Sequence, residues 1–312
     1  MPVPDYQTLM LPILKYLGDG ATRATVPDVT DHLTALFHLT QEDLDQRISS
    51  GQSLVYNRSH WAVTYMSKAG LVSRPGRGKV AITQRGKDAL ATSPAKVDVT
   101  FLRQYPEFEA FRLKAKGQTT SSPVVPAPVD PAQDQNPEEL LYSTYDALRA
   151  EVEADILDRL QSDSLDWEFF EHVVVELLVR MGFGSNVEES RHRVTKKSGD
   201  DGIDGVIDED RLGLDAVYIQ AKRYGAKTSV GRPALQAFAG SLEGQRASKG
   251  VFITTSYFTG EAEDYVKRIS KRIVLIDGKA LARLMYEHGV GVRTRRTLDV
   301  KRVDEAYFEG DI

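Results

Sequence analysis

Cysteine is absent from this chain of 312 residues, and its absence excludes several classes of site. A disulfide framework, a cysteine-ligated zinc or iron–sulfur site and a thiol nucleophile all require that side chain. Long apolar runs are absent too, since no stretch reaches the roughly 18 residues that suggest a transmembrane helix. The opening segment MPVPDYQTLMLPILKYL also lacks the basic start of a secretory signal. These absences predict a cytoplasmic protein without a membrane partner.

The chain also lacks an overall excess of positive charge. It contains 40 Lys and Arg residues against 45 Asp and Glu residues, which gives a net charge of −5. Any signal for nucleic-acid binding must therefore be local. Hydrophobic residues make up 41% of the chain and charged residues 27%, as in globular proteins. At about 150 residues per domain, this length predicts two domains.

A proline-rich segment between Lys116 and Glu139 divides the chain. Its prolines are Pro123, Pro126, Pro128, Pro131 and Pro137. Proline fixes φ and removes a backbone donor, so the segment predicts an extended linker. A surface loop inside one domain is the alternative, but the segment is long for a loop. We therefore expect one domain at residues 1–95, a connecting segment at 96–138 and a second domain at 139–312.

The first domain shows helical periodicity followed by a small hairpin. Apolar spacing predicts helices near 5–16, 26–39, 42–49 and 58–69, and Thr40 and Asp43 fit a capping box. The segment LVSRPGRGKVAITQRG predicts two short strands, 71–73 and 80–83, around a Pro-Gly turn. Helices followed by such a hairpin are typical of a winged helix-turn-helix domain.

Local charge favours DNA as the partner of this domain. Residues 51–90 contain seven basic residues and one acidic residue, a net charge of +6. We expect phosphate contacts from the hairpin and groove contacts from the preceding helix. A solvated basic turn without a partner is the alternative. The predicted DNA-binding residues are Arg74, Arg77 and Lys79 of the hairpin, and Asn57, Arg58, Ser59 and His60 of the helix.

The second domain alternates between helical and extended patterns. Helices are expected near 141–160, 166–181, 233–245, 261–271 and 280–287, and strands near 206–207, 216–221, 250–255 and 273–276. This order predicts an α/β domain with a central mixed sheet. Thr254, Thr255 and Ser256 end one strand, where hydroxyls often act as caps. No base beside them suggests a serine nucleophile.

Three polar residues stand at the ends of two neighbouring predicted strands. Asp204 follows a glycine-rich turn, and Gln220 and Lys222 end the next strand on one shared face. Oxygen ligands of this kind suit Mg²⁺, which activates water and stabilises charge in phosphodiester hydrolysis. A lysine beside the metal can orient that water. The alternatives are an ordinary turn aspartate and a surface lysine.

At this point the sequence resembles a known family, the Mrr restriction endonucleases. These are a modification-dependent branch of the PD-(D/E)xK nucleases. The segment SGQSLVYNRSHWAVTYMSKAGLVSRPGRGKVAITQRG resembles the family's N-terminal winged-helix domain. The resemblance to the family's catalytic domain lies in the segments FFEHVVVELLVRMGFG, GDDGIDGVID, YIQAKRY, VGRPALQAFAGSLEGQRASKGVFITTSYFT and VLIDG. The resemblance covers nearly the whole chain except the linker and the C-terminal tail.

The resemblance implies a role for individual residues. Asp204 matches the family's metal-binding aspartate and Lys222 its catalytic lysine. Gln220 stands where most of the superfamily has Glu or Asp, and Glu171 matches an acidic residue on a helix that aids the metal site. Because the Gln220 amide is neutral, the metal would depend on Asp204, Glu171 and the backbone carbonyl of Ala221. Metal binding is therefore expected to be weak until DNA phosphate arrives.

Gln236 resembles a recurrent glutamine of the family without an assigned role.

The function implied is a Mg²⁺-dependent restriction endonuclease acting on double-stranded, methylated foreign DNA, with Mn²⁺ able to replace Mg²⁺. Cutting both strands requires two active sites or two binding events, so we expect a homodimer or a higher homo-oligomer. Two alternatives stay open. One is a structure-specific nuclease of the resolvase or repair type, and the other is a non-catalytic winged-helix DNA-binding regulator.

Overall fold

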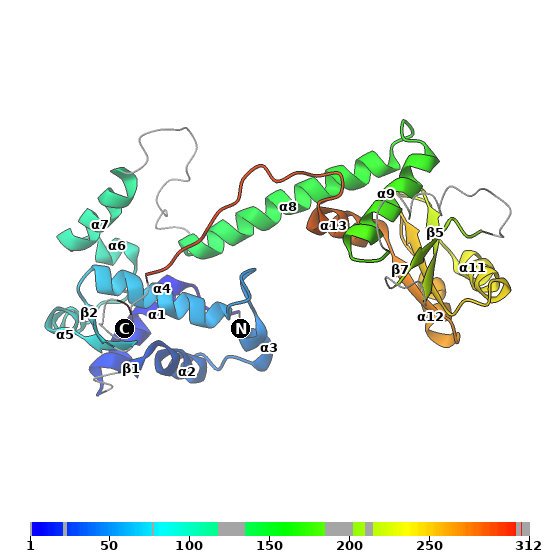
Figure 1. Cartoon of the computed structure of the whole chain (residues 1–312). Helices are drawn as coiled ribbons and strands as arrows, with labels where there is room; N and C mark the ends of the chain where they lie inside the picture. Colours follow the sequence, from blue (N-terminus) through cyan, green and yellow to red (C-terminus); the bar gives the residue numbers. More distant parts are fainter. Residues whose placement is uncertain are drawn as a thin grey trace. The chain divides into compact units, whose positions relative to one another are not determined.

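The computed structural model describes residues 2–20, 24–76, 78–117, 135–184, 202–209, 215–303 and 307, with backbone alone at 114–117. Contacts between residues divide the chain into two units (Figure 1). The first consists of Met1–Asp146 with Val300–Ile312, and the second is Ala147–Asp299. Each unit has its own hydrophobic core, so each is described by itself below.

The N-terminal unit is mainly helical with one small sheet. Its elements are α1 (Tyr6–Gly18), β1 (Ala24–Thr25), α2 (Val26–Leu36), α3 (Gln41–Asp45), α4 (Leu54–Lys68), β2 (Val72–Gly76), β3 (Lys79–Ile82), α5 (Gln84–Ala91), α6 (Val99–Leu102) and α7 (Pro106–Gly117). The sheet has the order β1-β3-β2 and is antiparallel. The hairpin predicted from the Pro-Gly turn is present, although β2 extends further toward the turn than expected. The predicted capping box of Thr40 and Asp43 is also confirmed.

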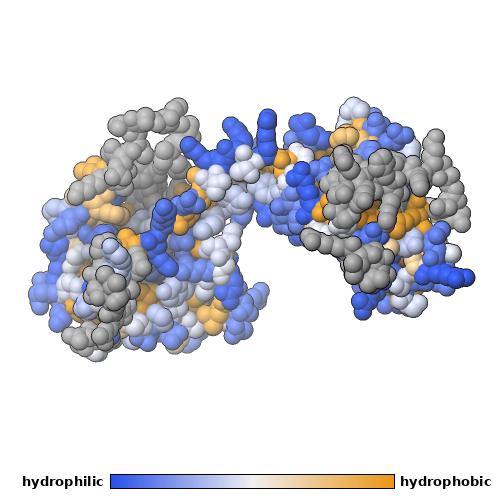
Figure 2. Space-filling view, in the orientation of Figure 1, coloured by the Kyte–Doolittle hydropathy of each residue, from blue (hydrophilic) through white to orange (hydrophobic). Residues whose placement is uncertain are grey.

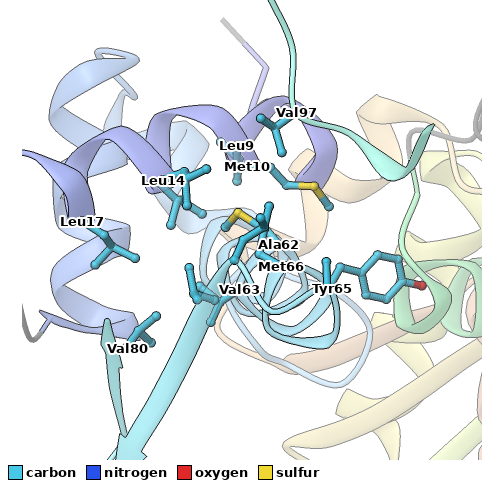
Figure 3. Packing of buried hydrophobic residues seen from close by; sticks show 14 of the residues in the cluster. Leu9, Met10, Leu14, Leu17, Ala62, Val63, Tyr65, Met66, Val80 and Val97 are labelled. Atoms are coloured by element: carbon cyan, nitrogen blue, oxygen red, sulfur yellow. The ribbon is translucent and has the colours of Figure 1, made fainter. Parts of the chain in front are cut away.

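Helices α1 and α4 form the centre of the N-terminal core, as Figure 3 shows. Leu9, Met10 and Leu14 from α1 lie beside Val63 and Met66 from α4, and all are fully buried. Burying side chains of this size stabilises a fold by about 1.5–3 kcal/mol each. The apolar spacing of both helices therefore accounts for their packing.

The connecting segment begins later than the sequence analysis expected. Val97, Val99, Leu102 and Phe108 are buried in the N-terminal core, although residues 96–138 were assigned to the connection. Helices α6 and α7 were therefore missed. The prediction of a connecting segment rested on the prolines nearby. The four apolar side chains instead pack in buried positions against α1 and α4. The packed part of the first unit thus extends well beyond residue 95.

The second unit contains the predicted mixed sheet. Its elements are α8 (Pro137–Gln161), α9 (Trp167–Arg180), β4 (Gly205–Asp208), β5 (Ala216–Lys222), α11 (Arg232–Gly244), β6 (Lys249–Thr254), α12 (Gly260–Arg268), β7 (Arg272–Ile276) and α13 (Gly278–His288). The strand order is β4-β5-β6-β7, with β4 antiparallel to β5 and the other pairs parallel. Helix α8 begins in the first unit and ends in the second.

The sheet has a hydrophobic layer on each face. Val251 and Ile253 of β6 pack with α9 and α13, whereas Phe252 between them packs with α11 and α12. This alternation follows from the two-residue repeat of a strand. The catalytic candidates Gln220 and Lys222 therefore lie on a sheet that is held in place from both sides.

The apolar stripe expected along α8 is buried only at its C-terminal end. Ile156 and Leu160 belong to the second core, whereas Leu141, Leu148 and Val152 are between 37% and 58% exposed. Hydrophilic residues cover most of the visible surface in Figure 2, with hydrophobic residues in separate areas. Among the described residues, no helix combines the length and apolar character needed to cross a membrane.

Candidate active site and nucleic-acid interface

Asp204 is fixed against β5 by two hydrogen bonds. Its backbone N–H donates to the Ile219 carbonyl at 2.8 Å, and its side-chain Oδ2 accepts from the Ala221 N–H at 2.7 Å. The second bond continues the ladder between β4 and β5 through a side chain. The aspartate therefore has a defined position at the start of β4, where the sequence analysis placed it.

Glu171 on α9 lies in the same pocket as Asp204. The residues lining this pocket are Glu171, Val174, Val175, Asp204, Gly205, Ile219 and Ala221. Alternate carbonyls of a strand point the same way, so the Ala221 carbonyl leaves β5 on the edge that faces Asp204, as the Ile219 carbonyl does. The structure thus gathers two carboxylates and one backbone carbonyl around one small space.

The two carboxylates influence each other's protonation. Burial, followed by the charges of Asp204 and Glu168, raises the pKa of Glu171 to about 7, while Lys222 opposes this shift. Burial also raises the pKa of Asp204, against the lowering effects of the Ala221 N–H and of Lys222. Lys222 therefore lies within electrostatic reach of both acids. A cation in this pocket would relieve the cost of two buried negative charges.

Gln220 and Lys222 leave β5 on the opposite side from Ala221, because side chains alternate along a strand. The Gln220 side chain is buried under the turn at Gly202, and a Cβ at Gly202 would lie 2.9 Å from its Nε2. Gly202 has a φ of +91°, which glycine adopts without strain. Gln220 does not line the pocket of Glu171 and Asp204. Within the described part of the chain, its Oε1 has no hydrogen-bond partner.

This donor set is compatible with a divalent cation. The buried oxygen of this set that lacks a partner among the described residues is Gln220 Oε1. Burying such an oxygen without a partner costs about 1–3 kcal/mol of stability, and a ligand that binds it can recover this free energy. Across the described ranges, no three His, Cys, Asp or Glu side chains converge on one point. A metal here would be bound by two carboxylates and neutral oxygens, with water or phosphate completing its shell, which is the chemistry that Mg²⁺ tolerates.

Three of the predicted DNA-binding residues are occupied within the protein. Asn57 and Ser59 are 1% and 0% exposed, and Ser59 Oγ donates to the Val55 carbonyl at 2.8 Å. Arg58 donates from Nε and Nη2 to both carboxylate oxygens of Glu139, at 3.0 and 2.7 Å. These three residues are therefore not available to a duplex in this structure, contrary to the prediction.

The start of α8 supplies the partners of these residues. Asn57 Nδ2 donates to Glu138 at 2.8 Å, and Asn136 Nδ2 donates to Asn57 Oδ1 at 2.8 Å. Asn136 also accepts from the N–H groups of Glu138 and Glu139, so it caps α8. The sequence analysis did not predict this network, because the hydrogen bonds that join Asn57 and Arg58 to this segment link residues 79 to 81 positions apart in the chain.

The remaining candidates lie on another side of α4 and on the hairpin. The His60 ring stacks on Tyr56 with centroids 6.5 Å apart, and its pKa is lowered by burial and by the nearby positive charges of Arg74 and Arg302. Arg74 Nη2 donates to Thr64 Oγ1 at 2.9 Å.

Lys79 begins β3, where it pairs with Gly76 across the hairpin. Arg77 lies outside the described residues. Gln236 is exposed on α11 and does not line the pocket of Glu171 and Asp204. The structure thus offers no contact that would assign a role to Gln236.

Comparison with known proteins finds two matching family models. A restriction endonuclease model, Mrr_cat, matches residues 162–285, and the Mrr N-terminal domain model matches residues 6–92. A curated relative from Escherichia coli (strain K12) is the type IV methyl-directed restriction enzyme EcoKMrr. It is 36% identical over 313 residues, and the match covers 99% of this chain and 100% of the relative.

Two solved structures are more distantly similar. The MspJI restriction endonuclease in complex with a 27-mer oligonucleotide is 17% identical with a TM-score of 0.32, and the match covers 66% of this chain and 42% of that one. The DNA modification-dependent restriction endonuclease AspBHI is 16% identical with a TM-score of 0.35, and the match covers 71% and 56%. Scores this low do not establish a shared arrangement of the whole chain.

Proposed function

The chain belongs to the Mrr family of restriction endonucleases, which are DNA-cleaving hydrolases, and on this premise we propose that it cuts modified foreign DNA in a Mg²⁺-dependent reaction. Its second unit has the restriction-endonuclease-like α/β fold with a mixed sheet. The observation that carries the proposal is the meeting of Glu171 and Asp204 at one pocket, with the charge of Lys222 within electrostatic reach of both acids. Methylated DNA as the substrate follows the methyl-directed relative.

The residues of the pocket fit a divalent cation, which the family generally uses. Asp204, Glu171 and the Ala221 carbonyl would bind Mg²⁺, with Mn²⁺ as a substitute. Gln220 Oε1, which is unpaired among the described residues and lies outside the pocket lining, is the further neutral oxygen proposed as a ligand. When bound, the ion supplies charge stabilisation and a water of lowered pKa. The neutral amide of Gln220 adds no charge, so DNA phosphate is expected to strengthen metal binding.

Each side chain of the site then has its own task. Asp204, held by the Ala221 N–H, presents its carboxylate in one orientation. Glu171, whose pKa is raised to about 7, would hold a proton in the empty site and would release it to solvent when a cation is bound, because the positive charge favours the carboxylate. The Lys222 ammonium orients the attacking water and stabilises the charge that develops on the phosphate oxygens. These three residues would therefore carry the reaction.

For the N-terminal unit we propose a winged-helix role in binding double-stranded DNA. The order of helices and hairpin supports this, as do the basic residues Arg74 and Lys79 on the two strands of the hairpin. The first unit, Met1–Asp146 with Val300–Ile312, would hold recognition, and the second unit, Ala147–Asp299, would hold cleavage. Since cutting both strands requires two active sites, we also propose that a homodimer or a higher homo-oligomer acts on DNA.

Plasmid cleavage with Mg²⁺ tests the proposal. The same plasmid is prepared without modification, with adenine methylation and with cytosine methylation, and a four-way junction is run beside it. We expect the wild type to cut methylated plasmid, and Asp204→Ala and Lys222→Ala to lose cleavage. Asp163→Ala and Lys227→Ala, which alter exposed residues outside the pocket, are matched controls.

Each other outcome would change the proposal in a different way. Equal cutting of all plasmids would remove the requirement for methylation. Preferred cutting of the junction would favour a structure-specific nuclease. Tight duplex binding without any cutting, under every metal condition, would favour a DNA-binding regulator.

A further inference from the structure

Three buried hydroxyl residues follow one another at the end of β6. Thr254, Thr255 and Ser256 are 0%, 0% and 7% exposed. No base lies beside them in the described contacts, so nucleophilic chemistry does not account for them. Their hydrogen bonds lead instead to the segment that follows β5, where Lys222 is the last strand residue.

Thr254 binds the backbone of the proposed catalytic lysine. The two residues are register partners on the parallel strands β5 and β6. Thr254 Oγ1 donates to the Lys222 carbonyl at 2.8 Å, while the Thr255 N–H reaches the same carbonyl at 3.3 Å. The backbone bond is longer than the usual range for an N–H donor. The hydroxyl therefore supplies the shorter of the two bonds that hold Lys222.

Thr255 makes similar contacts to Tyr224, which lies two residues after Lys222 in the chain. Its Oγ1 accepts from the Tyr224 N–H at 2.8 Å and donates to the Tyr224 carbonyl at 2.7 Å. One hydroxyl thus satisfies both backbone groups of a residue beyond the end of β5. The two threonine side chains extend the ladder past Lys222, where strand pairing has ended. We call this pair of residues the hydroxyl clamp.

The clamp is itself supported from behind. Gln161 Nε2 donates to the Thr255 carbonyl at 2.6 Å. Gly278, the first residue of α13, packs so closely that a Cβ there would lie 2.3 Å from the Thr255 carbonyl oxygen. The Ser256 N–H donates to Thr254 Oγ1 at 3.2 Å. These contacts leave the clamp little freedom to shift.

We propose that Thr254 and Thr255 are positioning residues for Lys222, an inference that rests on the proposed role of that lysine in cleavage. The direction of a side chain depends on the backbone on both sides of its Cα. The pairing of β5 with β6 fixes the backbone before Lys222, and the hydroxyl clamp fixes the backbone after it. Without the clamp, the peptide after Lys222 can rotate and move the ammonium away from Asp204.

Valine and serine substitutions at Thr254 separate the hydroxyl from the shape of the side chain. Thr254→Val keeps the branched shape and removes the bond to Lys222, whereas Thr254→Ser keeps the hydroxyl. We expect Thr254→Val to lower single-turnover cleavage by about tenfold to a hundredfold, the effect of misplacing a catalytic group by about 1 Å. Duplex affinity should be unchanged, and Thr254→Ser should restore most of the rate.

Thr30→Val is a matched control. Thr30 is a buried threonine of α2 whose Oγ1 donates to the Val26 carbonyl at 2.9 Å, outside the nuclease unit. It should lower Tm as Thr254→Val does, because each change removes one buried hydrogen bond, but leave the cleavage rate unchanged. Equal rates for wild type and Thr254→Val would overturn the proposal, as would equal losses for Thr254→Val and Thr254→Ser.

Two further outcomes are distinguishable. A wild type that cuts no DNA would remove the proposed function and the role of Lys222 together. If Thr254→Val fails to fold, Thr255→Val and Thr255→Ser test the same clamp through Tyr224. Hydrogen exchange of the Tyr224 amide should then speed up by about tenfold in Thr255→Val, while amides of β6 keep their protection. No change at Tyr224, with wild-type cleavage, would contradict the clamp.

Discussion

At the scale of single residues, the raised pKa of Glu171 should make the proposed metal binding depend on pH. Burial and the charge of Asp204 raise its pKa to about 7, so it holds a proton just below that pH. A metal ion must displace this proton, and its affinity should therefore rise with pH and level off above the pKa. We expect about a tenfold change per pH unit below the pKa, measured by Mn²⁺ titration of the protein between about pH 6 and pH 8.

Glu171→Gln provides the control for this titration. The substitution removes the proton that competes with the metal, so binding should become weaker and lose most of its dependence on pH above the range where Asp204 titrates. The burial-raised pKa of Asp204 leaves a smaller dependence at lower pH. Wild-type metal affinity that stays constant across neutral pH would contradict the coupling.

Gly202 lies directly against the side-chain amide of Gln220. We predict that Gly202→Ala lowers the free energy of unfolding by about 1–2 kcal/mol, because its positive φ disfavours a side chain. The new Cβ would also displace the Gln220 amide and slow cleavage. Gly225→Ala is the matched control, since Gly225 has open space around it and no positive φ. Thermal unfolding and cleavage rates of both variants test this; equal effects would refute it.

At the scale of elements, the start of α8 is locked to α4 by a buried ion pair. Arg58 and Glu139 are 15% and 6% exposed, and two bonds join them. Removing one partner of a buried pair leaves an unpaired charge, which costs about 3–5 kcal/mol. We therefore predict that Glu139→Ala strongly lowers the free energy of unfolding of the N-terminal unit, measured by denaturant titration. A double-mutant cycle with Arg58→Ala would give the coupling energy.

Arg85 and Glu107 offer a control for the buried pair. They also form two hydrogen bonds, from Arg85 Nη1 and Nη2 between α5 and α7, but their side chains are 41% and 56% exposed. Water screens such a pair, so its loss should have a much smaller effect than the loss of Glu139. Comparable effects for Glu107→Ala and Glu139→Ala would show that burial does not govern the strength of the α8 contact.

The same elements show what the sequence could reveal. The capping box at Thr40 and the two neighbouring strands that carry Asp204 and Lys222 depend on nearby residues, and both were predicted. The partners of Arg58 were not, because Glu139 lies 81 residues away in a segment with many prolines. Local patterns specify helices and turns, whereas a polar side chain that suits DNA suits a buried carboxylate equally well.

At the scale of the whole molecule, the boundary between the two units falls inside α8. We predict that a fragment ending at residue 146 unfolds at a higher temperature than one ending at residue 117. The shorter fragment leaves Asn57, Arg58 and Trp61 without the partners that Asn136, Glu138 and Glu139 supply. Thermal unfolding of both fragments tests this, and equal Tm values would show that α8 does not belong to the first unit.

The three-dimensional arrangement of the site could also be predicted only in part from the sequence. Asp204, Gln220 and Lys222 were found from spacing along two strands, but the separation of Gln220 from the pocket depends on the side-chain alternation and on the Gly202 turn. The role of Thr254 depends on its register with Lys222 in a parallel pair. Parallel pairing joins residues that are distant in sequence, and no local pattern predicts its register.

Because α8 belongs to both units, it restricts where related proteins can exchange segments by recombination. A recombination in the proline-rich segment would join one protein's α4 to another protein's Asn136 and Glu139, and the buried network would survive only if both parents kept the same partners. A crossover just after Asp146, before Arg149 pairs with Glu153 and Glu287, avoids this conflict, because both cores stay whole. The first three turns of α8 should therefore be inherited together with the first unit.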